Sequence, residues 1–179
     1  MVSGRLGGAC AVTQVHEPPA QGSLIAMDLA IVTGAQWPEE TGKLLRALPE
    51  WFGIEQSILG YIDAARTLPS AAALLDGKVV GVCMVRHHTP VAAEVELLAV
   101  ARELHRRGIG RRLIDSVAAD LRTSGVRLLQ VKTFGPSGSS DEYARTRAFY
   151  ESLGFMPLEE RTDIWGIENP CLISVKALD

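Results

Sequence analysis

Gly108 and Gly110 lie in an arginine-rich segment that separates a predicted strand, residues 91–100, from a predicted amphipathic helix. Five of the 14 arginines of the chain lie between Arg102 and Arg112. A glycine-containing turn at a helix start presents free backbone N–H groups and the positive end of the helix dipole, which together suit pyrophosphate. Arginine adds a planar guanidinium that can bond two phosphate oxygens at once. The segment therefore predicts a site for a phosphorylated cofactor.

Two better-known phosphate motifs do not account for this segment. Leu113 stands where a dinucleotide-binding fingerprint has its third glycine, and no Gly-Lys-Ser/Thr sequence follows, so the segment is not a P-loop. The alternative to a cofactor site is an ordinary turn before a surface helix, with its arginines in solvent.

Glu94 and Glu96 form the second group that could do chemistry. They are two residues apart on the predicted strand, so both side chains point to the same face of the sheet. One interpretation is a solvated strand face. The other is a general base that takes a proton from an ammonium group, directly or through water, and such a base is worth about 10²–10⁴ in rate.

The elements that position these residues follow from apolar periodicity and from turn residues. Asp76-Gly77 between two apolar runs predicts a hairpin. The crossover through the helix after Gly110 predicts that the strands on either side of it are parallel neighbours. The predicted strands are residues 23–32, 71–75, 78–87, 91–100, 126–134, 155–163 and 172–178, and the predicted helices are 37–48, 55–66, 109–124 and 139–153.

Composition limits the class of protein. The chain has 179 residues and a net charge of −3, which disfavours a nucleic-acid or membrane-surface partner. No apolar run is long enough to span a membrane, and the first residues do not have the pattern of a secretory signal. We expect residues 1–24 to be a weakly ordered extension and residues 25–179 to form one domain in the cytoplasm.

The cysteines and the paired histidines do not predict a metal site. Cys10, Cys83 and Cys171 are widely spaced and odd in number, which argues against a disulfide framework and against a thiolate site. We expect the last two to be buried and inert. His87 and His88 are adjacent, so on a strand they point to opposite faces; they are interpreted as a pair at the end of a strand, before a turn.

The segment His105-Arg106-Arg107-Gly108-Ile109-Gly110 resembles the signature of the GCN5-related N-acetyltransferases (GNAT), (Gln or Arg)-x-x-Gly-x-(Gly or Ala), except for His105 at the first position. The family's second signature resembles residues 146–155, which contain an FYxxxGF string. The Asn that often precedes it would fall at Tyr143. The resemblance spans residues 25–178. It implies a mixed α/β GNAT acyl-CoA N-acyltransferase fold, with a central, mostly antiparallel sheet, one parallel pair at the cofactor site, and flanking helices.

The resemblance also implies an activity, the transfer of an acetyl group from acetyl-CoA directly to a primary amine, without a metal. Glu96, slightly favoured, or Glu94 would be the general base, and Tyr150 would protonate the departing thiolate. A backbone N–H near Leu98 would polarise the thioester carbonyl. The cofactor-binding residues implied are Leu98, Ala99, Val100, His105, Arg106, Arg107, Gly108, Ile109, Gly110, Arg111, Arg112, Tyr143, Arg147 and Phe149.

Other functions stay open at this point. The departures at His105 and Tyr143 motivate an acyl-CoA-binding or regulatory module without catalysis. An arginine-patch nucleic-acid binder conflicts with the net charge. The acceptor is open among small molecules and the amines of peptides or proteins, and the oligomeric state is open, although homodimers are common in the family. By analogy, Trp51, Phe52, Trp165 and residues 169–171 would line the acceptor pocket, unless they are ordinary packing residues.

Overall fold

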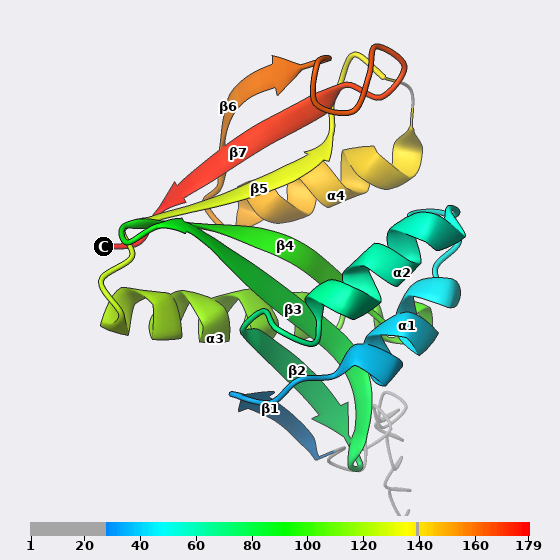
Figure 1. The fold of residues 1–179 in the computed structure, drawn as a ribbon, viewed down its shortest axis with the longest axis vertical. Coiled ribbons are helices and arrows are strands. Elements are labelled where there is room, and N and C mark those ends of the chain that lie inside the picture. The colour runs from blue at the N-terminus through cyan, green and yellow to red at the C-terminus, as the bar shows by residue number, and fades with distance from the viewer. Residues whose placement is uncertain (1–27, 139) are drawn as a thin grey trace, which may run out of the picture.

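One seven-stranded sheet with helices on both faces organises the computed structural model, which describes residues 28–138 and 140–179 (Figure 1). The strand order across the sheet is β1-β2-β3-β4-β5-β7-β6. The elements are β1 (Leu29–Thr33), α1 (Pro38–Arg46), α2 (Glu55–Ala64), β2 (Ser70–Leu75), β3 (Lys78–Thr89), β4 (Ala92–Val100), the short 3₁₀ helix η1 (Arg102–Leu104), α3 (Ile109–Thr123), β5 (Leu128–Phe134), α4 (Asp141–Ser152), β6 (Met156–Arg161) and β7 (Cys171–Ala177).

The predicted order of elements and the mixed α/β class are confirmed. All neighbouring strands are antiparallel except β4 and β5, which are parallel as the crossover predicts. The β2–β3 turn has positive φ at both Asp76 (49°) and Gly77 (76°), which is the backbone of a type I′ hairpin turn. The predicted extension and Cys10 lie outside the described residues, as do the first residues of the strand predicted at 23–32.

Several predicted boundaries differ from the structure by one or two residues. The prediction that β3 ends at His87 is wrong, because the ladder continues until Thr89 pairs with Ala92. Helix α2 ends two residues early, at Ala64. Helix α4 begins at Asp141, where the Ser140 hydroxyl accepts a hydrogen bond from the Tyr143 N–H; the predicted cap, Ser139, lies outside the described residues.

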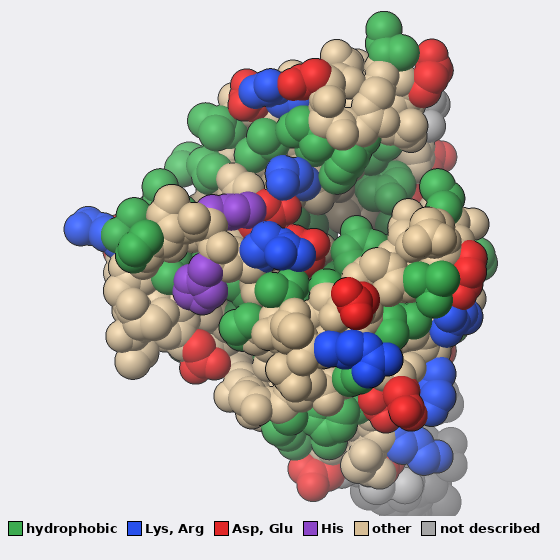
Figure 2. Space-filling model, in the orientation of Figure 1, with side chains coloured by type: hydrophobic (Ala, Val, Ile, Leu, Met, Phe, Trp, Pro, Cys, Tyr) green, Lys and Arg blue, Asp and Glu red, His purple; other side chains and the backbone are tan. Residues whose placement is uncertain are grey.

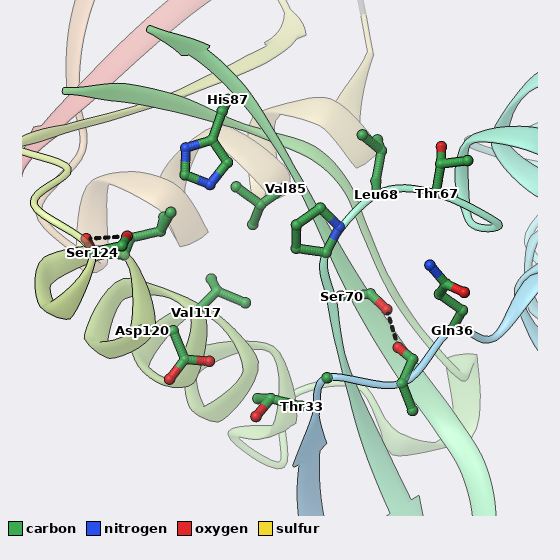
Figure 3. A pocket seen from close by; sticks show the side chains of 14 residues that line it. Thr33, Gln36, Thr67, Leu68, Ser70, Val85, His87, Val117, Asp120 and Ser124 are labelled. Carbon is green, nitrogen blue, oxygen red and sulfur yellow. Dashed lines mark hydrogen bonds between the residues drawn. The ribbon is translucent and has the colours of Figure 1, made fainter. Parts of the chain in front are cut away.

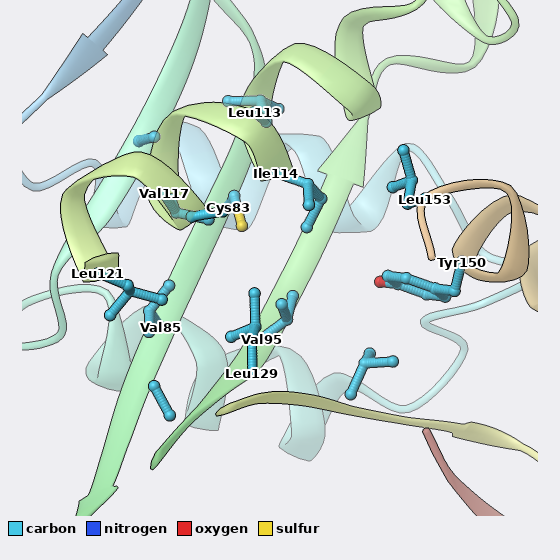
Figure 4. Close-up of a cluster of buried hydrophobic side chains, with 14 of the residues drawn as sticks. Cys83, Val85, Val95, Leu113, Ile114, Val117, Leu121, Leu129, Tyr150 and Leu153 are labelled. Carbon is cyan, nitrogen blue, oxygen red and sulfur yellow. The ribbon is translucent and has the colours of Figure 1, made fainter. Parts of the chain in front are cut away.

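Two apolar cores, one on each face of the sheet, hold the helices in place. Helix α3 presents a stripe at helical spacing to the sheet, formed by Leu113, Ile114, Val117 and Leu121. Tyr150 of α4 and Leu153, the C-cap of that helix, join the same core (Figure 4). Helices α1 and α2 cover the opposite face, where Leu45, Ile58, Met84 and Leu97 are buried.

Strands β4 and β5 pair only at their first residues. The parallel ladder joins Ala92–Val95 to residues 128–131, and the two strands then diverge (Figure 1). The divergence coincides with a β-bulge, because Val95 pairs with Val85 and Leu97 with Met84, which leaves Glu96 as the extra residue. We call the space between the diverging strands the β4–β5 opening. Along it, the β5-facing edge of β4 has no ladder partner in β5.

Candidate active site

The glycine turn, which contains Gly108 and Gly110, lies next to the β4–β5 opening and leads into α3. Gly108 is the N-cap of α3 with φ +79°, a left-handed conformation that glycine adopts without strain. The first intrahelical donor is the N–H of Arg112, which bonds the Gly108 carbonyl at 3.1 Å. The earlier N–H groups of the helix therefore have no helical acceptor. The helix has no side-chain cap and no acidic residue in its first turn, so these N–H groups suit an anion.

Gly110 lets α3 and α4 approach closely. A Cβ placed on Gly110 would lie 3.1 Å from Cζ of Phe149, closer than most real Cβ contacts. The Phe149 ring in turn packs edge-on against Tyr150, with centroids 5.2 Å apart. The second glycine of the motif therefore joins the turn to the helix that carries the second signature.

The five arginines between Arg102 and Arg112, here called the arginine cluster, differ in their intramolecular contacts. Three guanidinium groups have partners: those of Arg102, Arg111 and Arg112 contact Glu50, the Ser152 carbonyl and the Leu29 carbonyl, respectively. Arg106 and Arg107 are exposed and form no hydrogen bond or ion pair with the part of the chain that the structure describes. Within the described residues, these two guanidinium groups are thus the ones of the cluster without an intramolecular partner.

His105 connects the turn to the end of β4. Its Nε2 lies 2.8 Å from the Val100 carbonyl oxygen, and its ring packs edge-on against Trp51 at 5.7 Å. The residue that departs from the family signature therefore has a structural contact of its own.

The end of β4 leaves its backbone free on one side. Beyond Val95, the strand pairs only with β3, where Leu98 lies opposite Cys83 and Ala99 opposite Val82. Leu98 also packs against the core under α3, and Ala99 is buried on the other face. Within the described residues, no strand pairs with the β5-facing edge of residues 96–100.

Glu94 is the centre of a buried polar network. Its Oε2 lies 2.7 Å from His88 Nε2 and accepts hydrogen bonds from Gln130 (2.7 Å) and Lys132 (2.9 Å). Burial alone would raise the pKa of Glu94, but the hydrogen bonds from Lys132, Gln130 and His88 outweigh it and hold the pKa below its ordinary value. The network fastens β5 to β4 just before the two strands diverge.

Glu96 occupies the bulge and is more accessible. Its carboxylate accepts two hydrogen bonds from Arg86, at 2.8 and 3.0 Å. The side chain is 22% exposed, against 7% for Glu94. Their partners Arg86 and His88 are two residues apart on β3, which places both carboxylates on one face of the sheet, as their spacing predicts. We refer to Glu94 and Glu96 as the acidic pair.

We expect Glu94→Gln to lower the free energy of unfolding at pH 7 by about 1.5–3 kcal/mol, because the amide replaces a charged acceptor with a neutral one and turns an N–H₂ group toward other donors. The folded pKa of Glu94 lies below the unfolded value of about 4.3, so its contribution is present above that pH and is lost as the pH falls through the folded pKa. Urea unfolding of both proteins at pH 7 and pH 3 would test this; a difference that does not shrink at pH 3 would contradict it.

Helix α4 brings the second signature against the opening. Tyr150 is 7% exposed, and its hydroxyl points from α4 toward β4 (Figure 4). Burial, with a smaller effect of Cys83, raises the pKa of Tyr150 and keeps its hydroxyl protonated. Arg147 donates to the Phe134 carbonyl at 2.8 Å, and Tyr143 packs on the Phe134 ring. Tyr143 and Arg147 therefore share a face at the end of β5.

A separate pocket of about 480 Å³ lies on the other face of the sheet (Figure 3). Its lining includes Thr33, Ser70, His87 and Asp120, but neither member of the acidic pair. His87 thus faces this pocket while His88 faces Glu94, as adjacent residues on a strand must. No group of three or more His, Cys, Asp or Glu side chains in the described ranges could hold a metal ion.

The remaining sequence expectations have mixed outcomes. Cys83 and Cys171 are free and buried, as expected. Of the residues suggested for an acceptor pocket, Phe52 packs on Tyr61 and Trp165 is 44% exposed. None of the described helices combines the length and hydropathy that a membrane crossing requires.

The partners of the acidic pair were not identified from the sequence. Arg86 and His88 are two residues apart on the neighbouring strand, as Glu94 and Glu96 are on β4. This matching spacing could have indicated that the two pairs of side chains meet. Gln130 and Lys132 come from a distant segment, and only the strand register brings them to Glu94.

Comparison with known proteins decides the family. Residues 69–157 match the family model described as an acetyltransferase (GNAT) domain. The chain belongs to the GNAT family. The match covers β2 through the start of β6, and therefore includes the acidic pair, the glycine turn and α4. An uncharacterized N-acetyltransferase of Chlorobaculum tepidum is 32% identical over 84 residues, which cover 47% of each chain. The match thus spans about half the length of this curated relative.

Solved structures show that the GNAT fold extends over most of the chain. A putative GNAT acetyltransferase from Desulfovibrio desulfuricans superposes with a TM-score of 0.72 at 21% identity, covering 84% of this chain and 99% of the other. An aminoglycoside 6′-N-acetyltransferase complexed with coenzyme A superposes with a TM-score of 0.67 at 17% identity, covering 84% and 97%. At these identities the likeness establishes the fold and not the substrate.

Proposed function

We propose that this GNAT protein is an N-acetyltransferase that transfers the acetyl group of acetyl-CoA directly to a primary amine. The observation that carries the proposal is the β4–β5 opening, which has the glycine turn at its end and the acidic pair on its wall. The coenzyme A complex of a structural neighbour supports the same choice of cofactor.

The residues present fit acetyl-CoA. The free N–H groups at the start of α3 and the guanidinium groups of Arg106 and Arg107 suit its pyrophosphate. The unpaired edge of β4 at residues 98–100 suits the amides of its pantetheine arm. Tyr143, Arg147 and Phe149 line the side formed by α4. When bound, the cofactor supplies an acetyl group activated as a thioester.

Glu96 is the better candidate for the general base. Glu94 is buried and already contacts His88, Gln130 and Lys132, and its pKa is lowered. It is therefore a weak proton acceptor. Glu96 is more exposed, and among the described residues it pairs with Arg86 alone, which bonds both carboxylate oxygens. In this assignment Glu96 accepts the proton of the acceptor ammonium, and Glu94 holds β4 and β5 together.

Tyr150→Phe is expected to lower kcat by about tenfold without abolishing turnover. The raised pKa keeps the Tyr150 hydroxyl protonated as a proton donor, but a thiolate, with a thiol pKa of about 8.5, leaves fairly well without help. Steady-state release of the CoA thiol would measure the effect. An unchanged kcat would remove Tyr150 from the reaction and leave it as a core residue.

The first experiment is thermal unfolding with and without acetyl-CoA, using ATP as a polyphosphate control. A ligand at about 100 times its dissociation constant adds about 2.7 kcal/mol of stability, which for a domain of this size raises Tm by roughly 5–11 °C. Stabilisation by acetyl-CoA and not by ATP supports the cofactor assignment. Absence of stabilisation at saturating acetyl-CoA would overturn the proposed function.

The second candidate is an acyl-CoA-binding module without catalysis. It is favoured by the pairing of both glutamates with cations and by the structural contacts of His105. This candidate predicts stabilisation by acetyl-CoA, no thiol release with any amine, and unchanged binding in Glu96→Gln.

A further inference from the structure

Tyr61, on α2, packs against the core on the face of the sheet that also carries the acidic pair, and the surface of this face is hollowed (Figure 2). The hollow lies between α2 and the strands around the β4–β5 opening, and basic, acidic and histidine side chains gather beside it over β3–β5 (Figure 2). The proposed reaction occurs at the acidic pair, so the acceptor amine must enter through this hollow. The residues that line it from α2 therefore select the acceptor.

Contacts at both ends fix the position of α2. The Arg46 guanidinium of α1 bonds both carboxylate oxygens of Glu55, the first residue of α2. Further along, Gly42 of α1 lies so close to the Ile62 side chain that a Cβ there would be 2.7 Å from Cδ1. Ile58 is buried against the sheet. These contacts hold the helix that carries Tyr61 at both of its ends.

Two aromatic pairs lie on the elements next to the acidic pair, one at α2 and one at the end of β5. On the α2 side, Phe52 packs edge-on against Tyr61 with centroids 5.8 Å apart. On the α4 side, Phe134 packs against Tyr143 at 5.3 Å. Gly138 permits the second pair, because a Cβ there would lie on the Phe134 ring.

The phenol of each aromatic pair stays protonated. Burial raises the pKa of the Tyr61 hydroxyl, and further increases come from the nearby Glu96, Tyr143 and Glu94. Burial also raises the pKa of Tyr143. Both phenols therefore stay uncharged. The charges of the acidic pair are already matched by Arg86 and Lys132, so among the described residues neither carboxylate is left as an unpaired charge for a second ionic group on the acceptor.

We propose that the acceptor is a primary amine carried on an apolar alkyl or aryl body, and that Tyr61 and Phe52 hold this body while the amine reaches Glu96. The inference rests on the proposed function and adds the substrate class. Aromatic walls gain contact energy from an apolar body, whereas a hydroxylated body would lose hydrogen bonds to water without replacement.

The experiment compares two small amines as acceptors, 2-phenylethylamine and ethanolamine, by thiol release at saturating acetyl-CoA. We expect kcat/KM to be at least about tenfold higher for 2-phenylethylamine. In Tyr61→Ala, the KM for 2-phenylethylamine should rise about tenfold or more while the KM for acetyl-CoA is unchanged. Tyr61→Phe keeps the ring and should stay within about threefold of the wild type. Leu59→Ala, at an exposed position of the same helix, is the matched control and should have no effect.

The outcomes separate the inference from the proposed function. If acetyl-CoA does not stabilise the protein, both are overturned. If it does, the inference alone is overturned by equal or better use of ethanolamine, by no turnover of 2-phenylethylamine, or by a Tyr61→Ala variant that folds and keeps its KM for that amine. A Tyr61→Ala effect on the KM for acetyl-CoA alone would also overturn it, because Tyr61 would then belong to the cofactor site.

Discussion

Replacement of Glu96 by Gln is expected to lower kcat/KM for an amine acceptor by about 10²–10⁴, the range for a positioned general base. The amide cannot accept the ammonium proton, although it keeps the shape of the side chain. Affinity for acetyl-CoA should be unchanged, because Glu96 is on the wall of the β4–β5 opening and not in the glycine turn. Thiol release as a function of pH, together with acetyl-CoA titration, measures both effects.

Glu159→Gln is the matched control for this variant. Glu159 is also a strand residue paired with an arginine, Arg161, but it is exposed on β6, so we expect wild-type activity. The base would have to be reassigned if Glu96→Gln remained active while Glu94→Gln, assayed as folded protein, lost activity to the same degree.

Gly110→Glu should weaken acetyl-CoA binding by about 10²-fold or more. A side chain here meets the Phe149 ring, since even a Cβ would lie 3.1 Å from it. The added carboxylate would also lie at the start of α3, where the cofactor's pyrophosphate is proposed to bind, and like charges in contact cost several kcal/mol. At 1.4 kcal/mol per factor of ten, this gives the expected loss. Calorimetric titration with acetyl-CoA would measure it.

Gly60→Glu provides the control for the second prediction. Gly60 is also a helical glycine, on α2, and a Cβ there meets no atom within 4 Å. The variant carries the same new charge far from the turn and should bind acetyl-CoA as the wild type does. Normal binding by a folded Gly110→Glu protein would show that the glycine turn is not the pyrophosphate site.

The sequence was sufficient for the features that depend on local signals. Apolar periodicity predicted α3 and its buried stripe, Asp76-Gly77 predicted a two-residue hairpin turn, and the crossover predicted the parallel pair. The glycine turn could be recognised for the same reason, because its φ requirement and its place before a helix are properties of consecutive residues.

What could not be predicted depends on tertiary register. A one-residue bulge sets apart the environments of Glu94 and Glu96, and no local pattern marks where a strand will take an extra residue. The arginines between Arg102 and Arg112 look alike in sequence, but three of them contact groups far along the chain, such as the Leu29 carbonyl. Tyr61 carries no motif, and only the packing of α2 on the sheet places it on the face that carries the acidic pair.

The short β4–β5 ladder separates the sheet into two strand groups, β1–β4 and β5–β7. Within the described residues, the strand ladder joins the group β1–β4 to the group β5–β7 only from Ala92–Leu128 to Val95–Val131, and the side chains of Gln130 and Lys132 add hydrogen bonds to Glu94. We expect amide hydrogens in β5–β7 to exchange through a partial opening that separates the two groups, at a lower free energy than global unfolding. A molecule that hydrogen-bonds to the free edge of β4 and also contacts β5 would link the two strand groups. Amide hydrogen exchange should then slow most in those strands of the group β5–β7 that the molecule does not contact. Cofactor binding would therefore be detectable throughout this group.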